Sequence, residues 1–142
     1  MARQAIAEWK GDLKGGRGHV KLGSGAYEGD YTFASRFEDK PGANPEELVG
    51  AAHAGCYSMA LANSLAQAGF VATSINTTAD VHLGKDDKGF LINRIDLTVV
   101  GDVPNLDDAT FQDYAEKTKV GCIVSRALAA TPMTLKATLK KK

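Results

Sequence analysis

The hydrophobic and polar positions of this chain follow two different periods, and the first is the alternation of a β-strand. The first third of the chain, "AIAEWKG" and then "GHVKLGSGAYEGDYTFASRF" through Phe37, reads as short antiparallel strands separated by glycine turns. "VATSINTTADVHLG" also alternates, and a "KDDKG" turn joins it to "GFLINRIDLTVVGDV", where Leu91, Asn93, Ile95, Leu97 and Val99 share one face. "MTLKATLK" near the end predicts a last strand.

The second period belongs to a long helix over residues 44–69. Asn44 is a good N-cap, Pro45 suits the first helical position, and Gly69 suits the C-cap. The predicted inner stripe holds residues three and four apart, and the other faces are hardly polar either. Its members are Leu48, Ala51, Ala52, Gly55, Met59 and Ala62. Because such a helix is apolar nearly all round, we expect it to be buried, with a second helix or a second subunit covering part of it.

Two more helices complete the predicted order. "DDATFQDYAEKTKVG" has Asp107 or Asp108 as its cap, an inner stripe that includes Phe111 and Thr118, and Gly121 at its end. "CIVSRALAA" predicts a short helix directly after it. The sequence therefore favours a single α+β domain over residues 1–142, with one central buried helix.

Composition and charge exclude several functions. The formal net charge is zero, with 17 basic and 17 acidic residues, so nothing favours binding to nucleic acid or to an anionic membrane. No apolar run reaches the roughly 18 residues that span a bilayer, and the first residues do not resemble a signal peptide, so we expect a cytoplasmic protein. The three histidines are far apart and lack metal-binding spacing, so we expect no metal.

The chain has two cysteines, Cys56 in the predicted central helix and Cys122 at the start of the short one. Two cysteines 66 positions apart are not a disulfide framework, so they are either buried thiols or a redox pair that meets in space. A reactive cysteine needs a donor that stabilises its thiolate. His53 lies one turn before Cys56, and Arg36 is a second candidate, which would need Glu46 or Glu47 as a carboxylate partner.

Around these residues the sequence resembles the OsmC/Ohr family of bacterial thiol peroxidases, most closely its OsmC branch. The matching motifs are "RFEDKPGANPEELVGAAHAGCYSMAL" and "KVGCIVSRAL", and the similarity extends through "WKGDLKGGRG" and "TSINTTADVHL" over nearly the whole chain. Ile123 stands where the branch often has proline, and Arg126 is an added cation beside Cys122.

The resemblance implies an OsmC-like fold with antiparallel sheets wrapped around central buried helices, in an intertwined homodimer. It implies that organic hydroperoxides are reduced in preference to hydrogen peroxide, with no cofactor. Cys56 matches the peroxidatic cysteine, Cys122 the resolving cysteine, Arg36 the arginine that holds thiolate and peroxide, and Glu46 the carboxylate that orients it. The implied reductant is a dihydrolipoyl group on a lipoylated protein, or another dithiol.

Helix geometry adds one constraint of its own. Glu46 and Cys56 are ten residues apart, which is about 15 Å of rise on a straight helix. One unbroken helix in one chain therefore cannot bring both to the same arginine: either the helix is broken, for example near Gly50, or the carboxylate comes from the other subunit. We expect an active site with residues from both subunits, and Glu46 as the residue from the partner chain.

Two other functions stay open on the residues alone. Cys56 and His53 would be nucleophile and base in a hydrolase or transferase, in which case Cys122 is dispensable. Alternatively, the protein is a non-catalytic dimer module with two buried structural thiols, since free cysteine is among the most buried residues.

Overall fold

The computed structural model describes residues 1–141, which form two compact units, Met1–Leu48 and the chain from Val49 onward. One element, the helix α2 (Pro45–Gln67), crosses the boundary between the two units without a break. The units are taken in turn below. The expectation of one domain over the whole chain stays a prediction.

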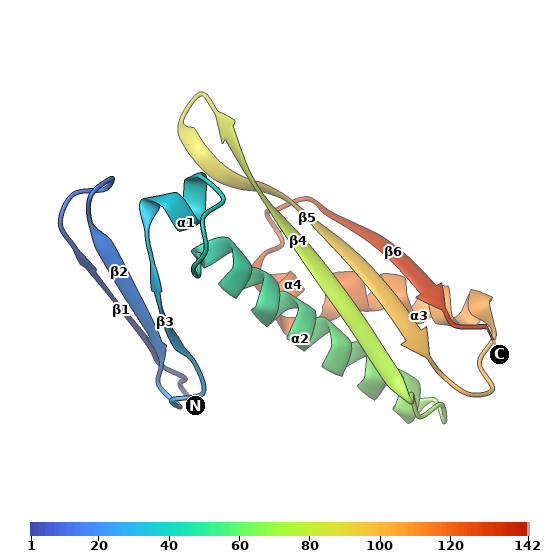
Figure 1. Ribbon diagram of the computed structural model, residues 1–142. Helices are drawn as coiled ribbons and strands as arrows, with labels where there is room; N and C mark the ends of the chain where they lie inside the picture. The colour runs from blue at the N-terminus through green and yellow to red at the C-terminus, as the bar shows by residue number, and fades with distance from the viewer. Residues whose placement is uncertain (142) are drawn as a thin grey trace. The chain divides into compact units, whose positions relative to one another are not determined.

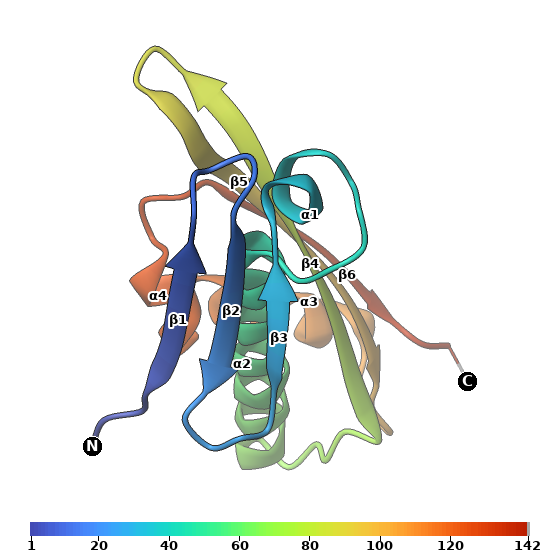
Figure 2. The ribbon, with the colours of Figure 1, turned by 60° about the vertical axis from the view of Figure 1, so that its left-hand side comes forward.

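The first unit is built on a three-stranded antiparallel sheet (Figure 2). Its strands follow one another as a meander, with Ala7 opposite Val20 and Val20 opposite Gly29. The strands are β1 (Ala5–Lys10), β2 (Arg17–Leu22) and β3 (Glu28–Tyr31). The alternating pattern and the glycine turns of the first third therefore predict these strands correctly.

The prediction of strand fails at "FASRF", which forms the short helix α1 (Phe33–Phe37). A capping box starts this helix: the backbone N–H of Ser35 donates to the Thr32 hydroxyl at 3.0 Å, and the Thr32 N–H donates to the Ser35 hydroxyl at 2.9 Å. The Ser35 hydroxyl also donates to the carbonyl of Ala43, at 2.8 Å. These local bonds override the apparent alternation, and Arg36 consequently lies on a helix instead of at the end of a strand.

Helix α2 begins and ends where the sequence predicts. Pro45 is its first residue, and the Glu47 N–H donates to the Asn44 side-chain oxygen at 2.8 Å. Gly69 follows the helix with a φ of +94°, the left-handed conformation that glycine adopts most easily.

The predicted inner stripe of α2 is wrong for a single chain. The fully buried hydrophobic residues of the helix, Tyr57, Leu61 and Leu65, lie on a different face, while Ala51, Ala52 and Gly55 are exposed and Met59 is 77% exposed. The pattern misleads because both faces are apolar, so periodicity alone does not choose between them. An added Cβ at Gly55 would meet nothing within 4 Å, whereas at Gly50 it would meet the carbonyl of Ala79 at 3.2 Å.

The second unit contains the sheet β4 (Ser74–Asp86), β5 (Gly89–Asp102) and β6 (Met133–Leu139), in that order. β4 and β5 are antiparallel and joined by the predicted tight turn, but β6 pairs with β5 in parallel. The expectation of purely antiparallel sheets is therefore wrong here, and this sheet is mixed. A parallel pair needs a crossover connection, which the two helices between β5 and β6 supply.

A β-bulge changes which residues of β5 share a face. His82 pairs with Arg94 and Leu83 with Ile92, so Asn93 is the extra residue. Ile95 is fully buried, but Leu91 is exposed and does not share its face as predicted, since the bulge shifts the alternation by one residue and turns Ile92 toward the core.

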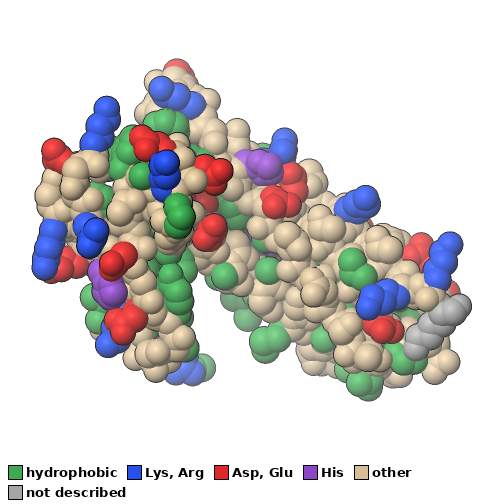
Figure 3. Space-filling model, in the orientation of Figure 1, with side chains coloured by type: hydrophobic (Ala, Val, Ile, Leu, Met, Phe, Trp, Pro, Cys, Tyr) green, Lys and Arg blue, Asp and Glu red, His purple; other side chains and the backbone are tan. Residues whose placement is uncertain are grey.

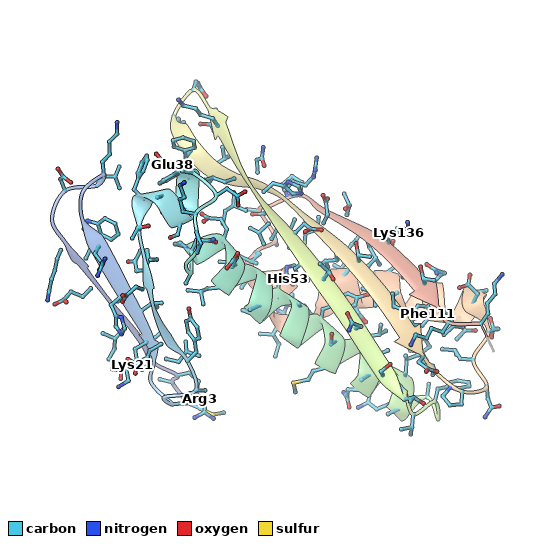
Figure 4. The ribbon with its side chains drawn as sticks, viewed as in Figure 1. Arg3, Lys21, Glu38, His53, Phe111 and Lys136 are labelled. Carbon is cyan, nitrogen blue, oxygen red and sulfur yellow. The ribbon has the colours of Figure 1, made fainter. Side chains whose placement is uncertain are left out.

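The helices α3 (Asp108–Gly121) and α4 (Ile123–Ala127) follow the sheet's second strand. The Asp107 side chain accepts from the Thr110 N–H at 2.9 Å and so caps α3 as predicted. Figure 1 shows α3 running beside α2 and the sheet, and Figure 4 places Phe111 on α3 and His53 on α2. A single buried cluster joins these elements: Tyr57, Leu61, Leu65, Ile95, Leu97, Val99, Val103, Phe111 and Cys122.

The surface carries interspersed charges of both signs, as Figure 3 shows for one face, in keeping with the neutral net charge. Within the described residues, no helix combines the length and the hydropathy that a membrane crossing requires.

The close approach of α3 to β5 generates a stability prediction. A Cβ at Gly101 would lie 2.6 Å from Cε2 of the fully buried Phe111 ring, so Gly101→Ala forces the ring or the strand to move. We expect it to lower the free energy of unfolding by about 1–3 kcal/mol in urea titration. Gly121→Ala is the matched control because a Cβ there meets nothing within 4 Å, and an equal loss in both variants would contradict this account of Gly101.

Candidate active site

An arginine–glutamate pair is the principal charged feature of the first unit. The guanidinium of Arg36, on α1, donates through Nη2 to Glu46 Oε1 at 2.8 Å and through Nε to the same oxygen at 3.1 Å. The Glu46 side chain is only 9% exposed and that of Arg36 is 37% exposed. The carboxylate partner that Arg36 needs is therefore Glu46 of the same chain, while Glu47 is exposed.

The backbone holds this pair in place at both ends. Glu46 lies in the first turn of α2, where the helix dipole favours a negative charge. Arg36 is held by the capped helix α1, and the Asn44 side chain donates to the Ser35 carbonyl at 3.4 Å. A planar guanidinium bound to a carboxylate on one edge keeps its remaining N–H groups in a fixed direction.

An apolar pocket of about 440 Å³ borders Arg36 within the first unit. Trp9 and Tyr31 lie with ring centroids 5.5 Å apart on one part of the wall, and Phe33 and Phe37 lie 4.9 Å apart on another. The complete lining is Trp9, Gly11, Leu13, Tyr31, Thr32, Phe33, Arg36 and Phe37. The pocket thus combines aromatic walls with a single cation, which suits a molecule with an apolar body and a polar, electron-rich group.

Cys56 lies on α2 in the second unit and is a free, half-buried thiol. It packs against the buried cluster to which Cys122 belongs. Cys122 is also a free thiol but is only 3% exposed. The two cysteines therefore border the same core as reduced thiols, one accessible and the other enclosed.

A chain of hydrogen bonds connects Cys122 to His53. The Cys122 thiol donates to the Ser125 hydroxyl at 3.0 Å, and Ser125 Oγ lies 2.7 Å from His53 Nε2. The Ser125 N–H donates back to Cys122 Sγ at 3.3 Å. All three side chains are buried, and burial lowers the pKa of His53 below its usual value, so its imidazole is neutral at physiological pH.

The neighbouring Tyr57 ties α2 to α3. Its hydroxyl donates to the Ala115 carbonyl at 2.8 Å, and burial is the main cause that raises the pKa of Tyr57 far above its ordinary value. Tyr57 is thus a structural donor and not a wall of an open pocket. The sequence offers Phe33, Tyr57 and Met59 as candidates to line a substrate pocket. Phe33 lines the pocket beside Arg36, whereas Tyr57 is enclosed and Met59 is exposed.

The sequence points to both cysteines, Arg36 and Glu46 as site residues, and these roles stay predictions. It does not point to Ser125, nor to Trp9 and Tyr31 in the pocket beside Arg36. The signal for Ser125 was present: Cys122 is the N-cap of α4 and Ser125 stands three residues later, the spacing of a side chain that reaches back to a cap. Trp9 and Tyr31 come from different strands, so only pairing both strands with β2 brings them together.

The other two histidines belong to surface ion pairs. His19, exposed on β2, lies between Asp30 and Glu28 at 2.6 and 3.0 Å, and these hydrogen bonds raise the pKa of His19. His82 lies 2.7 Å from Asp96. Among the described residues, no group of three or more potential ligands is arranged to hold a metal ion.

Comparison with known proteins gives matches over most of the chain. The family model for OsmC-like protein matches residues 37–137. The chain is 50% identical over 129 residues to "Peroxiredoxin OsmC" of Escherichia coli (strain K12), which covers 90% of each protein, and it matches the protein of that name from Shigella flexneri equally well.

Solved structures with this fold are also found. The organic hydroperoxide resistance protein OhrB of Bacillus subtilis superposes with a TM-score of 0.69 at 25% identity, covering 96% of this chain and 98% of that one. An OsmC-like protein of unknown function from Vibrio cholerae gives a TM-score of 0.76 at 14% identity, covering 96% and 99%. The second likeness concerns the fold alone.

The enclosed carboxylate of the Arg36–Glu46 pair generates a prediction about stability. A double-mutant cycle with Arg36→Ala and Glu46→Ala should give a coupling energy of about 1–3 kcal/mol by urea unfolding. Removing one partner leaves the other charged side chain without its counter-charge. The matched control is the exposed pair Lys117–Asp113, at 2.7 Å, whose cycle should give less than about 1 kcal/mol. Equal coupling in both cycles would show that Arg36 is not specifically held.

Proposed function

Because this chain belongs to the OsmC-like protein family, we propose that it is a cysteine-based peroxidase that reduces organic hydroperoxides with electrons from an external thiol. The observation that carries the proposal is the pair of free thiols, Cys56 accessible and Cys122 enclosed, at one buried cluster. The 50% identity to a protein named Peroxiredoxin OsmC supports the same reaction.

The reaction divides between the two sulfurs. The Cys56 thiolate attacks one oxygen of the peroxide, the O–O bond breaks, and the products are an alcohol and a sulfenic acid on Cys56. The Cys122 thiol then displaces the hydroxyl of the sulfenic acid, which releases water and forms the Cys56–Cys122 disulfide. An external dithiol reduces that disulfide by thiol–disulfide exchange, and both cysteines return to the thiol state.

Arg36 is proposed to stabilise the Cys56 thiolate and the negative charge that develops on the leaving peroxide oxygen. Glu46 orients the guanidinium by the two short hydrogen bonds to Oε1. The aromatic pocket beside Arg36 supports an organic substrate, because burying an alkyl or aryl group there contributes about 25 cal/mol per Å². Hydrogen peroxide has no such group to bury.

We propose that each active site combines residues of two chains. Arg36 is bound to Glu46 at the first turn of α2, and Cys56 follows on the same unbroken helix after about 15 Å of rise. The Arg36–Glu46 pair of one subunit would then serve Cys56 of the other. This modifies the expectation that Glu46 alone comes from the partner: the two residues act as one unit.

A second copy of this chain also explains the exposed face of α2. Ala51, Ala52 and Gly55 leave room for a close approach, and Met59 extends from the same side of the helix. An apolar helix face rarely stays open to water in a stable protein. We therefore propose an intertwined homodimer whose interface covers this face.

The remaining partners follow from the chemistry and the family. A dihydrolipoyl group on a lipoylated protein, or another dithiol, would supply electrons, and the reaction would take place in the cytoplasm. The hydrolase alternative is disfavoured, because His53 Nε2 is bound to Ser125 on α4 and its Nδ1 has no hydrogen-bond partner among the described residues.

The test of this function is peroxide consumption with dihydrolipoamide as the reductant. We expect kcat/KM for cumene hydroperoxide to exceed that for hydrogen peroxide by roughly 10²-fold, since an apolar group discriminates by a few kcal/mol at most. Cys56→Ser should lower turnover by about 10³-fold or more, whereas Cys122→Ser should still form the Cys56 sulfenic acid but no disulfide. Turnover by Cys56→Ser near the wild-type rate would refute the mechanism.

Complementation tests the two-chain site. Arg36→Ala and Cys56→Ser proteins are each inactive alone, but a mixed dimer pairs the intact Cys56 of one chain with the intact Arg36 of the other. Random exchange of subunits should restore roughly a quarter of the wild-type activity. Each variant taken alone through the same exchange is the control. A mixture that regains no activity although mass spectrometry shows mixed dimers would place Arg36 and Cys56 in one chain.

A further inference from the structure

A buried histidine stands at the end of a hydrogen-bond chain that starts at the resolving sulfur, and the reaction as described above leaves it without a role. His53 is fully buried on α2, and within residues 1–141 only its Nε2 has a hydrogen-bond partner. A buried imidazole nitrogen without a partner costs free energy, so a histidine retained in such a place calls for an explanation beyond packing.

We propose that Ser125 and His53 form a proton relay that activates Cys122 for attack on the oxidised Cys56. This inference rests on the proposed peroxidase function and assigns the residues of its second step. As the Cys122 sulfur attacks, its proton passes to Ser125 Oγ, and the Ser125 hydroxyl proton passes to His53 Nε2. Hydroxide leaves the Cys56 sulfur as the S–S bond forms and takes up a proton from solvent at the half-buried Cys56, while His53 returns its proton to solvent, so that the net product is water.

The distances permit both proton transfers without a rearrangement. Cys122 Sγ and Ser125 Oγ are 3.0 Å apart, and Ser125 Oγ and His53 Nε2 are 2.7 Å apart. Both separations are ordinary hydrogen-bond lengths for the atoms involved, and a hydroxyl donates and accepts at once. The Ser125 N–H, 3.3 Å from Sγ, remains as a donor to the developing thiolate.

The relay solves a problem that burial creates for Cys122. A thiol that is 3% exposed has little water beside it to take its proton, and the thiolate is the form that attacks. A neutral imidazole within the protein replaces bulk water as the acceptor. Burial keeps His53 neutral by lowering its pKa, and it is the single cause of that shift among the described residues.

The titratable groups nearest His53 in the sequence or linked to it by a hydrogen-bonded chain come from α2 and from the junction of α3 and α4, and burial, not a charged neighbour, causes the pKa shift of His53. Cys56 and Tyr57 are on α2 itself, and Cys122 stands between α3 and α4. Glu116 of α3 acts on the pKa of Tyr57 and not on that of His53. The Tyr57 hydroxyl is already donated to the Ala115 carbonyl.

The alternative is that the hydrogen bonds among Cys122, Ser125 and His53 only hold α4 against α2. The two explanations differ in pH dependence. With the relay, disulfide closure stays constant as pH falls until His53 is protonated, below its ordinary pKa near 6.5, because a protonated imidazole accepts no proton. Without the relay, the rate of disulfide closure follows the fraction of thiol that is ionised, which falls about tenfold for each pH unit at low pH.

The experiment measures closure in the intact protein with two triggers. The first is one equivalent of cumene hydroperoxide, with thiol loss followed by rapid quench and mass spectrometry. The second is one equivalent of 5,5′-dithiobis(2-nitrobenzoate), which forms a mixed disulfide on the accessible Cys56. Attack by Cys122 then releases a second thionitrobenzoate, seen by its absorbance, and the proton of Cys122 leaves through the relay to solvent.

His53→Gln keeps a side chain that can hydrogen-bond to Ser125 but removes the base, and Ser125→Ala breaks the relay in the middle. We expect closure at pH 7 to slow roughly 10²-fold in both variants, and the flat region of the pH profile to disappear. Ser58→Ala is the matched control: it also removes a side-chain hydrogen bond of α2, to Thr77 at 2.8 Å, and should close at the wild-type rate.

Closure at the wild-type rate in either folded variant, or slower closure with the flat region preserved, would overturn the proposal. If His53→Gln does not fold by circular dichroism, Ser125→Ala decides alone. The two triggers separate this proposal from the function it rests on. Dependence on His53 with the aromatic disulfide, but no oxidation of Cys56 by the hydroperoxide, would refute the peroxidase and leave the relay standing.

Discussion

Helix α2 runs without interruption from Pro45 to Gln67, and each candidate group of this chain lies on it or is connected to it by hydrogen bonds, directly or through one other side chain. Glu46 in its first turn holds Arg36, and His53 in its middle binds Ser125, which in turn contacts Cys122. A helix advances 1.5 Å per residue, so the separations along it are fixed by sequence number. Glu46 and Cys56, ten residues apart, are therefore separated by about 15 Å of rise along the helix.

Different hydrogen bonds and contacts fasten the part of α2 that lies in the second unit. Tyr57 is bonded to the backbone of α3, and Ser58 is bonded to Thr77 on β4. Leu61 and Leu65 are fully buried in the common cluster. At Gly50, an added Cβ would lie only 3.2 Å from the Ala79 carbonyl of β4, so the glycine lets the two backbones pack closely. The small residues of α2 therefore have two functions, since Gly50 admits the sheet of the same chain and Gly55 faces open space.

Much of the fold could be predicted from the sequence because its signals are local. Alternation finds the strands, and Asn44 and Asp107 mark helix starts because their side chains accept hydrogen bonds from backbone N–H groups of the first turn. The failures arise where the deciding interaction is not local or has two solutions. The bulge at Asn93 depends on pairing with β4, and the buried face of α2 depends on what packs against it. "FASRF" fails for the opposite reason: its cap is local, but the aromatic alternation conceals it.

The candidate site divides in the same way, into residues that the sequence singles out and residues that only the folded chain brings together. The two cysteines stand out by residue type, and the resemblance to the OsmC/Ohr family adds Arg36 and Glu46 as candidates. Ser125 is an ordinary residue whose importance comes from lying between a thiol and an imidazole. The aromatic wall around Arg36 likewise needs β1, β3 and α1 to meet before it exists. Contacts between distant segments thus supply what residue type alone does not.

The central claim is that the Arg36–Glu46 pair of one subunit acts on Cys56 of the other. A crystal structure of the reduced protein in its solution assembly tests it most directly, through the distances from Cys56 Sγ to both Arg36 guanidinium groups. The account predicts one arginine from the partner chain within about 4 Å of the sulfur, with its Glu46 still bound, and the chain's own Arg36 far away. A reduced site in which Cys56 contacts Arg36 of its own chain would contradict it.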